Sequence, residues 1–299
     1  MIADRPCRAV CSFCTMSSNR ARQSGQRPQV GIGWTLQHRP QTARRRSDTG
    51  YSGAAQRPLT ILIFLFPLII AYEVGSRLYL SSAETASVQT IRAHSVILGF
   101  FQDFGIVGRF LPAIALITVL VVWHVLNSDR WRVRLTVLLG MVAESIVLTL
   151  PLLVFIAMIQ LAIGSGGVGN SAGAAQLDST DALAKLPWRA GVAISIGAGL
   201  YEELLFRLIG VSALHLILVD LARFSDRVGT ALAVGVAAAA FAAYHDVVSG
   251  GQIEAVRAIS LLAAGGYFGA VFALRGFGVA VGVHIVYDVC VLVLFKAPG

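Results

Sequence analysis

Long apolar segments fill most of the chain from residue 59 onward. Seven of them carry few charges: 59–80, 110–126, 135–163, 188–219, 228–248, 255–274 and 277–295. An α-helix rises about 1.5 Å per residue, so about 20 residues cross the hydrocarbon core of a bilayer. Lipid leaves no partner for unpaired backbone groups, which restricts spanning structures to helices and closed barrels. We therefore predict an all-α, polytopic transmembrane helical bundle of seven to eight helices, with 91–104 as an interfacial helix or a short eighth span.

The charge content supports this prediction. Only 13% of the residues are charged and 56% are hydrophobic, whereas a soluble domain averages about 25% charged residues. So little charge cannot cover a water-soluble globule of 299 residues. Gly and Ala are frequent in the later spans, which lets helices approach closely in lipid and favours a packed bundle over separate anchors.

Residues 1–57 differ from the rest of the chain. They carry ten Arg but only two acids, Asp4 and Asp48, and contain no apolar run. We expect this Arg-rich segment to be disordered, and we expect residues 58–299 to form the transmembrane domain. A basic tail can bind nucleic acid, but beside membrane spans a role in setting the topology is favoured, so no nucleic-acid partner is expected.

The loop charges predict an orientation. With a cytoplasmic N-terminus, the inside loops carry Arg130, Arg132, Arg134 and further Arg residues, while loop 164–187 lies outside with the single Lys185. This is the distribution of the positive-inside rule. The chain contains two Lys against 22 Arg, which is typical of a GC-rich bacterial genome and indicates the bacterial inner (cell) membrane.

Three cysteines, Cys7, Cys11 and Cys14, lie close together near the N-terminus. Their spacing resembles the cluster motif of radical-SAM enzymes, in which three thiolates bind an iron–sulfur cluster. Those enzymes also need a βα-barrel, and nothing downstream alternates strands with helices. We therefore interpret the three cysteines as part of the disordered segment.

Ionisable groups within the fourth span are the first functional signal. Glu202, Glu203 and Arg207 lie about 14 residues into a hydrophobic run, where each charge is costly. Glu203 and Arg207 are four residues apart and can pair along one helix face. A structural salt bridge explains that pair but leaves Glu202 unexplained, because Glu202 points about 100° away and is free to face a cavity.

Two further spans carry matching groups. The fifth contains Phe241 and His245, and the seventh contains His284 and Asp288, each pair spaced i, i+4. A buried histidine–carboxylate pair in the middle of a span is unexpected unless it has a function. Three separate spans thus each bring an acid or an imidazole, which indicates one shared site.

These segments, in this order, resemble the CPBP family (CAAX proteases and bacteriocin-processing enzymes, also called Abi proteins). The family pattern is E-E-x-x-x-R, then F-x-x-x-H, then H-x-x-x-N or H-x-x-x-D. Here it is matched by Glu202-Glu203 with Arg207, by Phe241 with His245, and by His284 with Asp288. The resemblance covers about residues 130–296 and implies a helical intramembrane endopeptidase that acts on a membrane-associated protein or peptide.

The resemblance also implies roles for the residues. Glu202 would be the general base that activates water, His245 would help to hold that water, and Glu203 and Arg207 would orient the motif. His284 and residue 288 would stabilise the oxyanion of the tetrahedral intermediate. Better-studied members of the family have Asn at the last position. Asp288 can donate a hydrogen bond only when protonated; otherwise it orients His284 or binds a metal.

Three alternatives remain open. Glu202, His245 and His284 resemble a His₂Glu zinc site, although the H-E-x-x-H spacing of helical zinc peptidases is absent. We favour the mechanism that requires no cofactor, with zinc as the alternative. A proton-coupled transporter would also bury such groups, but we find no internal repeat. A non-catalytic scaffold or immunity protein would tolerate the loss of Glu202.

The remaining polar residues of the spans are weaker candidates. Glu73 and Glu144 are single acids whose partners the sequence does not reveal, and His94, His124 and His215 belong to no motif. We expect the histidines to be interfacial or structural. Cys290, in an apolar run, is expected to pack as a small hydrophobic residue.

Overall fold

Helices make up nearly all of the chain that the computed structural model describes. It describes residues 50–80, 92–106, 108, 110–127, 131–163, 187–245, 247–249 and 252–295. All of them belong to one compact unit, 33–299. Residues 1–49, with Cys7, Cys11 and Cys14, and nearly all of the expected external loop lie outside the described residues.

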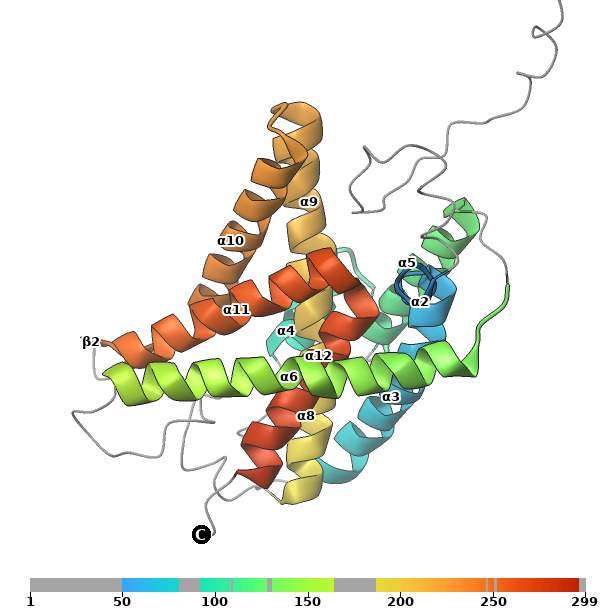
Figure 1. The fold of residues 1–299 in the computed structure, drawn as a ribbon. Coiled ribbons are helices and arrows are strands. Elements are labelled where there is room, and N and C mark those ends of the chain that lie inside the picture. The colour runs from blue at the N-terminus through green and yellow to red at the C-terminus, as the bar shows by residue number, and fades with distance from the viewer. Residues whose placement is uncertain are drawn as a thin grey trace, which may run out of the picture. The chain divides into compact units, whose positions relative to one another are not determined.

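The elements follow one another along the chain as a run of helices with one short hairpin (Figure 1). They are α2 (Tyr51–Ala55), α3 (Pro58–Tyr79), α4 (Arg92–Asp103), α5 (Leu111–Asn127), α6 (Leu135–Ile163), α8 (Trp188–Glu202), the π-helix η2 (Glu203–Val211), α9 (Ser212–His215), the π-helix η3 (Leu216–Leu221), α10 (Asp226–Tyr244), β1 (Val248–Ser249), β2 (Gln252–Ile253), α11 (Ala255–Arg275), α12 (Phe277–Val289) and the π-helix η4 (Cys290–Leu294). The two strands pair in antiparallel fashion and are two residues each. The all-α fold class predicted from the sequence is confirmed.

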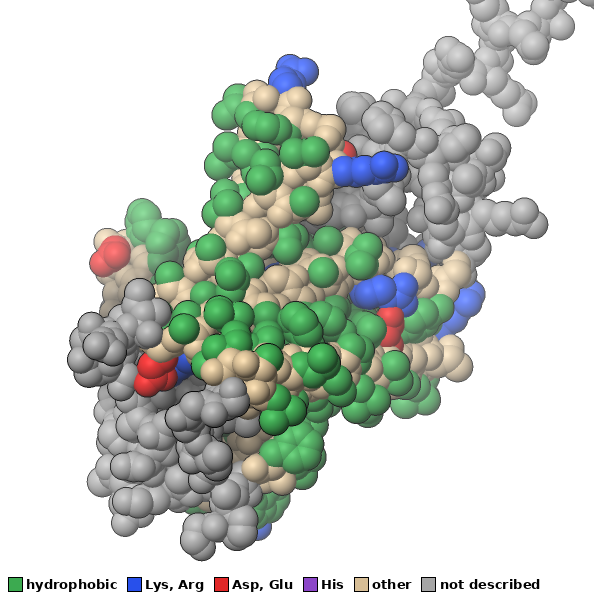
Figure 2. Space-filling model, turned by 60° about the vertical axis from the view of Figure 1, so that its left-hand side comes forward, with side chains coloured by type: hydrophobic (Ala, Val, Ile, Leu, Met, Phe, Trp, Pro, Cys, Tyr) green, Lys and Arg blue, Asp and Glu red, His purple; other side chains and the backbone are tan. Residues whose placement is uncertain are grey.

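All seven expected spans are helical. Six of the described helices are long and apolar enough to cross a membrane. The seventh, α5, has 17 residues and is about 25 Å long at 1.5 Å per residue, somewhat short of a full span. On the face drawn in Figure 2, hydrophobic side chains cover most of the described surface and Lys and Arg are few. Such a surface suits contact with lipid, so the chain is an integral membrane protein.

Helix α12 lies at the centre of the bundle. It packs against α3, α6, α8 and α11 (Figure 1), and 61% of its apolar window is buried, the highest share of any candidate span among the described helices. A helix that other helices cover on most sides is apolar all round, so its sequence is a continuous apolar run without an amphipathic period. The central position puts His284 and Asp288 in the interior, although both are polar.

One glycine allows α8 to approach α12 closely. A Cβ atom at Gly199 would lie 2.4 Å from the Ile285 side chain and 3.2 Å from the Ile285 backbone nitrogen. Gly199 is one turn before Glu202, and Ile285 is next to His284. The absence of a side chain at Gly199 therefore brings the acidic motif of α8 within reach of the histidine on α12.

Helix α2 departs from the expected disorder of residues 1–57. Tyr51 donates a hydrogen bond of 2.7 Å to Glu144 of α6, and Arg275, at the end of α11, donates to the same carboxylate and to Ser52. Burial, followed by the bond to Glu144, raises the pKa of the Tyr51 phenol above its usual range, which keeps it a donor. The sequence pattern missed this helix because it is five residues long and is held by contacts distant in sequence.

Helix α10 is shorter than predicted. The fifth span was expected to reach residue 248, but α10 ends at Tyr244, and His245 has an extended backbone with φ −86° and ψ 147°. The hairpin of β1 and β2 follows and returns the chain to α11. The expected extra helix near 91–104 exists as α4, whose 12 residues are too few to span a bilayer in the described structure.

Candidate active site

The six predicted site residues come together between α8, η2, α10 and α12. Glu202 ends α8, Glu203 and Arg207 lie on η2, His245 follows α10, and His284 and Asp288 lie on α12. Each of the six side chains is at most 5% exposed. The structure therefore buries four carboxylate or guanidinium groups and two imidazoles in one cluster, a costly arrangement that points to function.

Glu203 connects two of the three motifs. Its Oε1 atom lies 3.1 Å from Nη1 of Arg207 and accepts a hydrogen bond of 2.7 Å from Nδ1 of His284. Both partners are buried, so these are charge-assisted contacts in a low-dielectric interior. The bond fixes the orientation of the His284 ring and places its proton on Nδ1, with Nε2 directed toward the other polar groups.

The motif lies on a π-helix. Glu203 opens η2, a segment in which backbone hydrogen bonds join residues five apart. π-helical turns are uncommon and are often found at functional sites. In this wider helix Glu203 and Arg207 still lie on the same side, as their ion pair demonstrates.

Arg207 is enclosed by a backbone carbonyl and two aromatic rings, and of these residues only Phe241 belongs to a predicted motif. Its Nη2 atom donates a hydrogen bond of 3.2 Å to the carbonyl oxygen of Gly265 on α11. Its guanidinium carbon lies 4.5 Å from the ring centre of Phe241 and 5.3 Å from that of Phe268. Stacking on aromatic faces replaces part of the hydration that a buried guanidinium loses. Arg207 is therefore rigidly placed and holds Glu203 in turn.

Phe268 also contacts a catalytic candidate. Its ring stacks on the imidazole of His284, with centres 4.4 Å apart and planes inclined by 11°. Phe268 belongs to none of the three motifs, and within the apolar sequence of α11 no signal distinguished it from a lipid-facing residue. It supports the ring that Glu203 orients.

The side chain of His245 caps the C-terminal end of α10. Its Nδ1 atom donates a hydrogen bond of 2.8 Å to the carbonyl oxygen of Phe241, and the two rings are 4.6 Å apart. The imidazole thus caps a carbonyl that the helix leaves without an amide partner. In the neutral ring, Nε2 is then a hydrogen-bond acceptor.

Glu202 faces both imidazoles. Its Oε2 atom lies 3.9 Å from Nε2 of His245 and 3.8 Å from Nε2 of His284. These separations are too long for direct hydrogen bonds. Two contacts of this length that converge on one oxygen leave space for a bridging water molecule.

Asp288 completes the cluster from the next turn of α12. Its Oδ2 atom lies 3.5 Å from Nε2 of His284. Three carboxylates, those of Glu202, Glu203 and Asp288, therefore surround one imidazole. Residue 288 lies on the same side of His284 as Glu202, where it can act on whatever binds near Nε2.

Glu202, His245 and His284 are also the candidate ligands of a zinc ion. Among the described residues, no group of three or more His, Cys, Asp or Glu side chains is placed to hold a metal ion. Two ligand atoms that each lie about 2.0–2.2 Å from one zinc ion are at most about 4.4 Å apart. The separations of 3.8 and 3.9 Å around Glu202 therefore fit a bridging water molecule and a bridging ion alike.

The weaker candidates have structural partners. Glu144 pairs with Arg275 and Tyr51, and Tyr201 donates a hydrogen bond of 3.3 Å to Glu73. The three remaining histidines pack elsewhere, His94 against Tyr72 and Tyr201, His124 against Trp131, and His215 against Asp226. Cys290 is half-buried and free.

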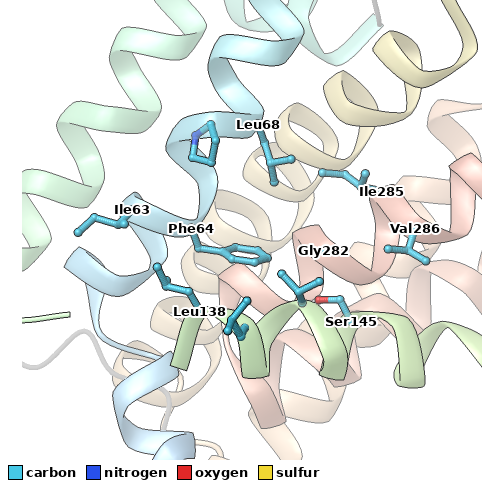
Figure 3. Close-up of a pocket in the computed structure, with 11 residues that line it drawn as sticks. Ile63, Phe64, Leu68, Leu138, Ser145, Gly282, Ile285 and Val286 are labelled. Carbon is cyan, nitrogen blue, oxygen red and sulfur yellow. The ribbon is translucent and has the colours of Figure 1, made fainter. Parts of the chain in front are cut away.

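An apolar cavity lies on another face of α12. It has a volume of about 320 Å³ and is bounded by α3, α6 and α12 (Figure 3). Its lining is Ile63, Phe64, Pro67, Leu68, Leu138, Leu139, Val142, Ser145, Gly282, Ile285 and Val286. None of these side chains is ionisable, and the Ser145 hydroxyl already donates to the Met141 carbonyl. The cavity has no group for acid–base chemistry and is distinct from the candidate active site.

Comparison with known proteins agrees with the geometry. Residues 184–290 match the family model of the type II CAAX prenyl endopeptidase Rce1-like proteins. Neither a search of curated proteins nor a search of solved structures found a match. The matched segment contains all three motifs. Over residues 184–290 the chain is therefore similar to CAAX-type intramembrane proteases, in agreement with the resemblance of its motifs to the CPBP family.

Proposed function

We propose that this protein is an intramembrane endopeptidase in which Glu202 activates a water molecule for attack on a peptide bond. The observation that carries the proposal is the position of Glu202 Oε2, 3.8 and 3.9 Å from the Nε2 atoms of two histidines. A water molecule between these atoms can donate one hydrogen bond to Glu202 and another to His245, whose Nε2 is an acceptor. Its oxygen lone pair is then free to attack.

The proposed reaction also needs a hydrogen-bond donor that stabilises the oxyanion. When His284 is protonated, Nδ1–H is held by Glu203, and Nε2–H can donate to the oxygen that becomes negative. Such donors matter because they are aimed in advance at the charge of the transition state. In this proposal Asp288, 3.5 Å from Nε2, either shares the task as a protonated acid or holds His284 in place as a carboxylate.

The chemical steps balance without a cofactor. Water adds its oxygen to the carbonyl carbon while Glu202 takes one proton, and the carbonyl oxygen becomes an oxyanion beside His284. The tetrahedral intermediate then collapses, the carbon–nitrogen bond breaks, and Glu202 returns its proton to the leaving amine. One product gains a carboxylate and the other an amine.

The surroundings indicate the class of substrate. The site is buried among helices that suit a lipid environment, so the substrate is a membrane-associated protein or peptide that reaches the site from the bilayer. Within the family, such substrates include prenylated proteins. For the protein itself, we propose the bacterial inner membrane with a cytoplasmic N-terminus, on the distribution of Arg residues.

The decisive experiment compares wild type with Glu202→Gln in liposomes. The probe is a library of quenched-fluorescence peptides anchored by an S-farnesyl cysteine. Glu202→Gln keeps the shape and removes the base, so cleavage should fall by at least about 10²-fold with an unchanged melting temperature. Asp220→Asn, an equivalent change at an exposed acid on η3, serves as the matched control. Full turnover by a stable Glu202→Gln variant would leave the transport or scaffold reading in its place.

A further inference from the structure

One face of α11 lines the candidate site, although α11 carries none of the three motifs. Leu261 packs in one buried cluster with Phe206 and Phe241, Gly265 accepts the hydrogen bond from Arg207, and Phe268 stacks on His284. These positions recur every three or four residues, the spacing of one helix face. Continued one turn toward the N-terminus of α11, the same face reaches residue 257.

Residue 257 is an arginine that lies near the catalytic histidine. The charge of Arg257 acts on His245, and α10 and α11 pack along each other. The short hairpin of β1 and β2 joins the two helices at this end. Arg257 is half-buried, so its guanidinium is neither in bulk water nor sealed in the core.

Arg257 differs from three other arginines of the described helices. Arg207 pairs with Glu203, Arg275 pairs with Glu144, and Arg92 donates a hydrogen bond of 2.8 Å to the Tyr244 carbonyl oxygen. The Nε atom of Arg257 is buried and makes no hydrogen bond within the part of the chain that the structure describes. No ion pair with a described acid compensates its charge either.

Further buried polar atoms at the end of α10 and the start of α11 also lack a hydrogen bond to any described residue. Nε2 of His245 and the Ser260 hydroxyl are buried, and among the described residues neither makes a hydrogen bond. The Glu202 carboxylate also acts electrostatically on the Tyr244 hydroxyl. Buried polar groups in native proteins almost always have partners, so several orphans at the end of α10 and the start of α11 indicate that a polar ligand binds here.

We propose that Arg257 binds a carboxylate of the peptide substrate, next to the water held by Glu202 and His245. This inference rests on the proposed peptidase function. A guanidinium presents donors in a planar fork that matches a carboxylate, and the bond is strong where water is largely excluded. A peptide carries such a group at its free C-terminus or on an Asp or Glu side chain. Arg257 is thus a substrate-binding residue that selects for an acidic group near the scissile bond.

The test uses one S-farnesyl cysteine peptide library in four forms, in liposomes with the full chain. Two forms end in a free carboxylate and two in an amide; within each pair, one contains Asp and the other Asn at the varied positions. The values of kcat and KM are measured for wild type, Arg257→Gln and Arg257→Lys. Arg227→Gln, at an exposed arginine of α10, is the control, and the melting temperature of each variant is recorded.

Arg257→Gln should lower kcat/KM by about 10- to 100-fold, mainly through KM, on the forms that carry the recognised carboxylate. It should change the matched amide or Asn forms by no more than about twofold, and Arg257→Lys should recover part of the loss. Selective loss on the free C-terminal forms identifies the terminal carboxylate as the ligand, and selective loss on the Asp forms identifies the side chain. An equal loss on all four forms, or no loss on any, overturns the proposal while the peptidase function stands. Absence of cleavage by wild type on every form is a different result and defeats the proposed function itself.

Discussion

The imidazole of His284 donates a hydrogen bond of 2.7 Å to the carboxylate of Glu203, a residue 81 positions earlier in the chain. The same oxygen of Glu203 lies 3.1 Å from Arg207. One carboxylate thus sets both the position of the guanidinium in its aromatic enclosure and the direction of the ring that faces Glu202. We therefore expect Glu203 and Arg207 to act as positioning residues, whose substitution lowers the stability of the fold.

Removal of one charge of this pair should destabilise the fold. Glu203→Gln leaves the buried Arg207 without its counter-charge, and loss of one partner of a buried pair costs about 3–5 kcal/mol. The double variant Glu203→Gln/Arg207→Met removes both charges, so it should melt at a higher temperature than Glu203→Gln alone. Thermal unfolding in one detergent provides the measurement. Melting of the single variant at the wild-type temperature would contradict the role assigned to the pair.

The chemistry should not depend on a metal. The described residues do not place three ligands around a common point, and the proposed steps use only protein groups and water. Cleavage should therefore survive dialysis against a zinc chelator that a control shows to reach the site. Metal content and activity are measured on the same samples. A stoichiometric zinc that tracks activity and disappears in His245→Ala and His284→Ala would establish the metallopeptidase alternative.

A short and a long deletion of the N-terminal segment should differ in their effect on the stability of the protein. Deletion of residues 2–49 should leave both activity and melting temperature unchanged, because these residues lie outside the motifs and the matched segment. Deletion of residues 2–57 also removes Tyr51 and Ser52, which bind Glu144 and Arg275. At about 0.5–1.5 kcal/mol for each hydrogen bond, the longer deletion should lower stability by about 1–3 kcal/mol.

Tyr51→Phe in the full chain is the matched control for that deletion. It keeps the ring and removes only the donor to Glu144, so it should reproduce part of the loss. Melting temperatures of wild type and the three variants decide the question. If both deletions melt with wild type, α2 contributes nothing to the bundle.

The sequence revealed the polar residues that cluster in the candidate site better than the residues that enclose them. Glu202, His245 and His284 were visible because charged or polar groups in apolar spans are costly and therefore conspicuous. Phe268 and Gly265 were not visible, because an aromatic ring or a glycine in an apolar helix is ordinary until its contacts are known. Arg257 was passed over because it stands at the start of a span, where arginines commonly face the membrane surface.

The local backbone was also beyond prediction. The π-helical turn at Glu203 gives no residue pattern of its own, and it lies where α8 packs on α12 and η2 packs on α10. The end of α10 at Tyr244 depends on a side-chain bond from His245 to Phe241, which replaces the next helical turn. In both cases tertiary contacts override the hydrophobic run that set the expected boundaries.

Asp288→Asn distinguishes two roles within the proposed mechanism. Oδ2 of Asp288 lies 3.5 Å from Nε2 of His284, close enough to act either on the oxyanion or on the ring. An amide donates a hydrogen bond without first needing a proton. If residue 288 serves as an oxyanion donor, Asn should preserve or raise kcat. If Asp288 acts as a carboxylate that holds His284, Asn should lower kcat by about 10²-fold, the scale for loss of a group that supports an oxyanion donor.

We expect the first result, because Glu203 already fixes the orientation of His284 through Nδ1. The matched comparison is His284→Ala, which removes the oxyanion donor itself and should lower kcat by about 10²–10³-fold whichever role Asp288 has. Cleavage of the farnesyl-cysteine peptides in liposomes is measured for both variants, with melting temperatures on the same preparations. A folded Asp288→Asn variant as inactive as His284→Ala would rule out the donor role and assign residue 288 to the support of the histidine. Activity at or above wild type would mean that the amide found in related proteases and the acid found here occupy the same catalytic position for the same reason, the donation of a hydrogen bond to the oxyanion.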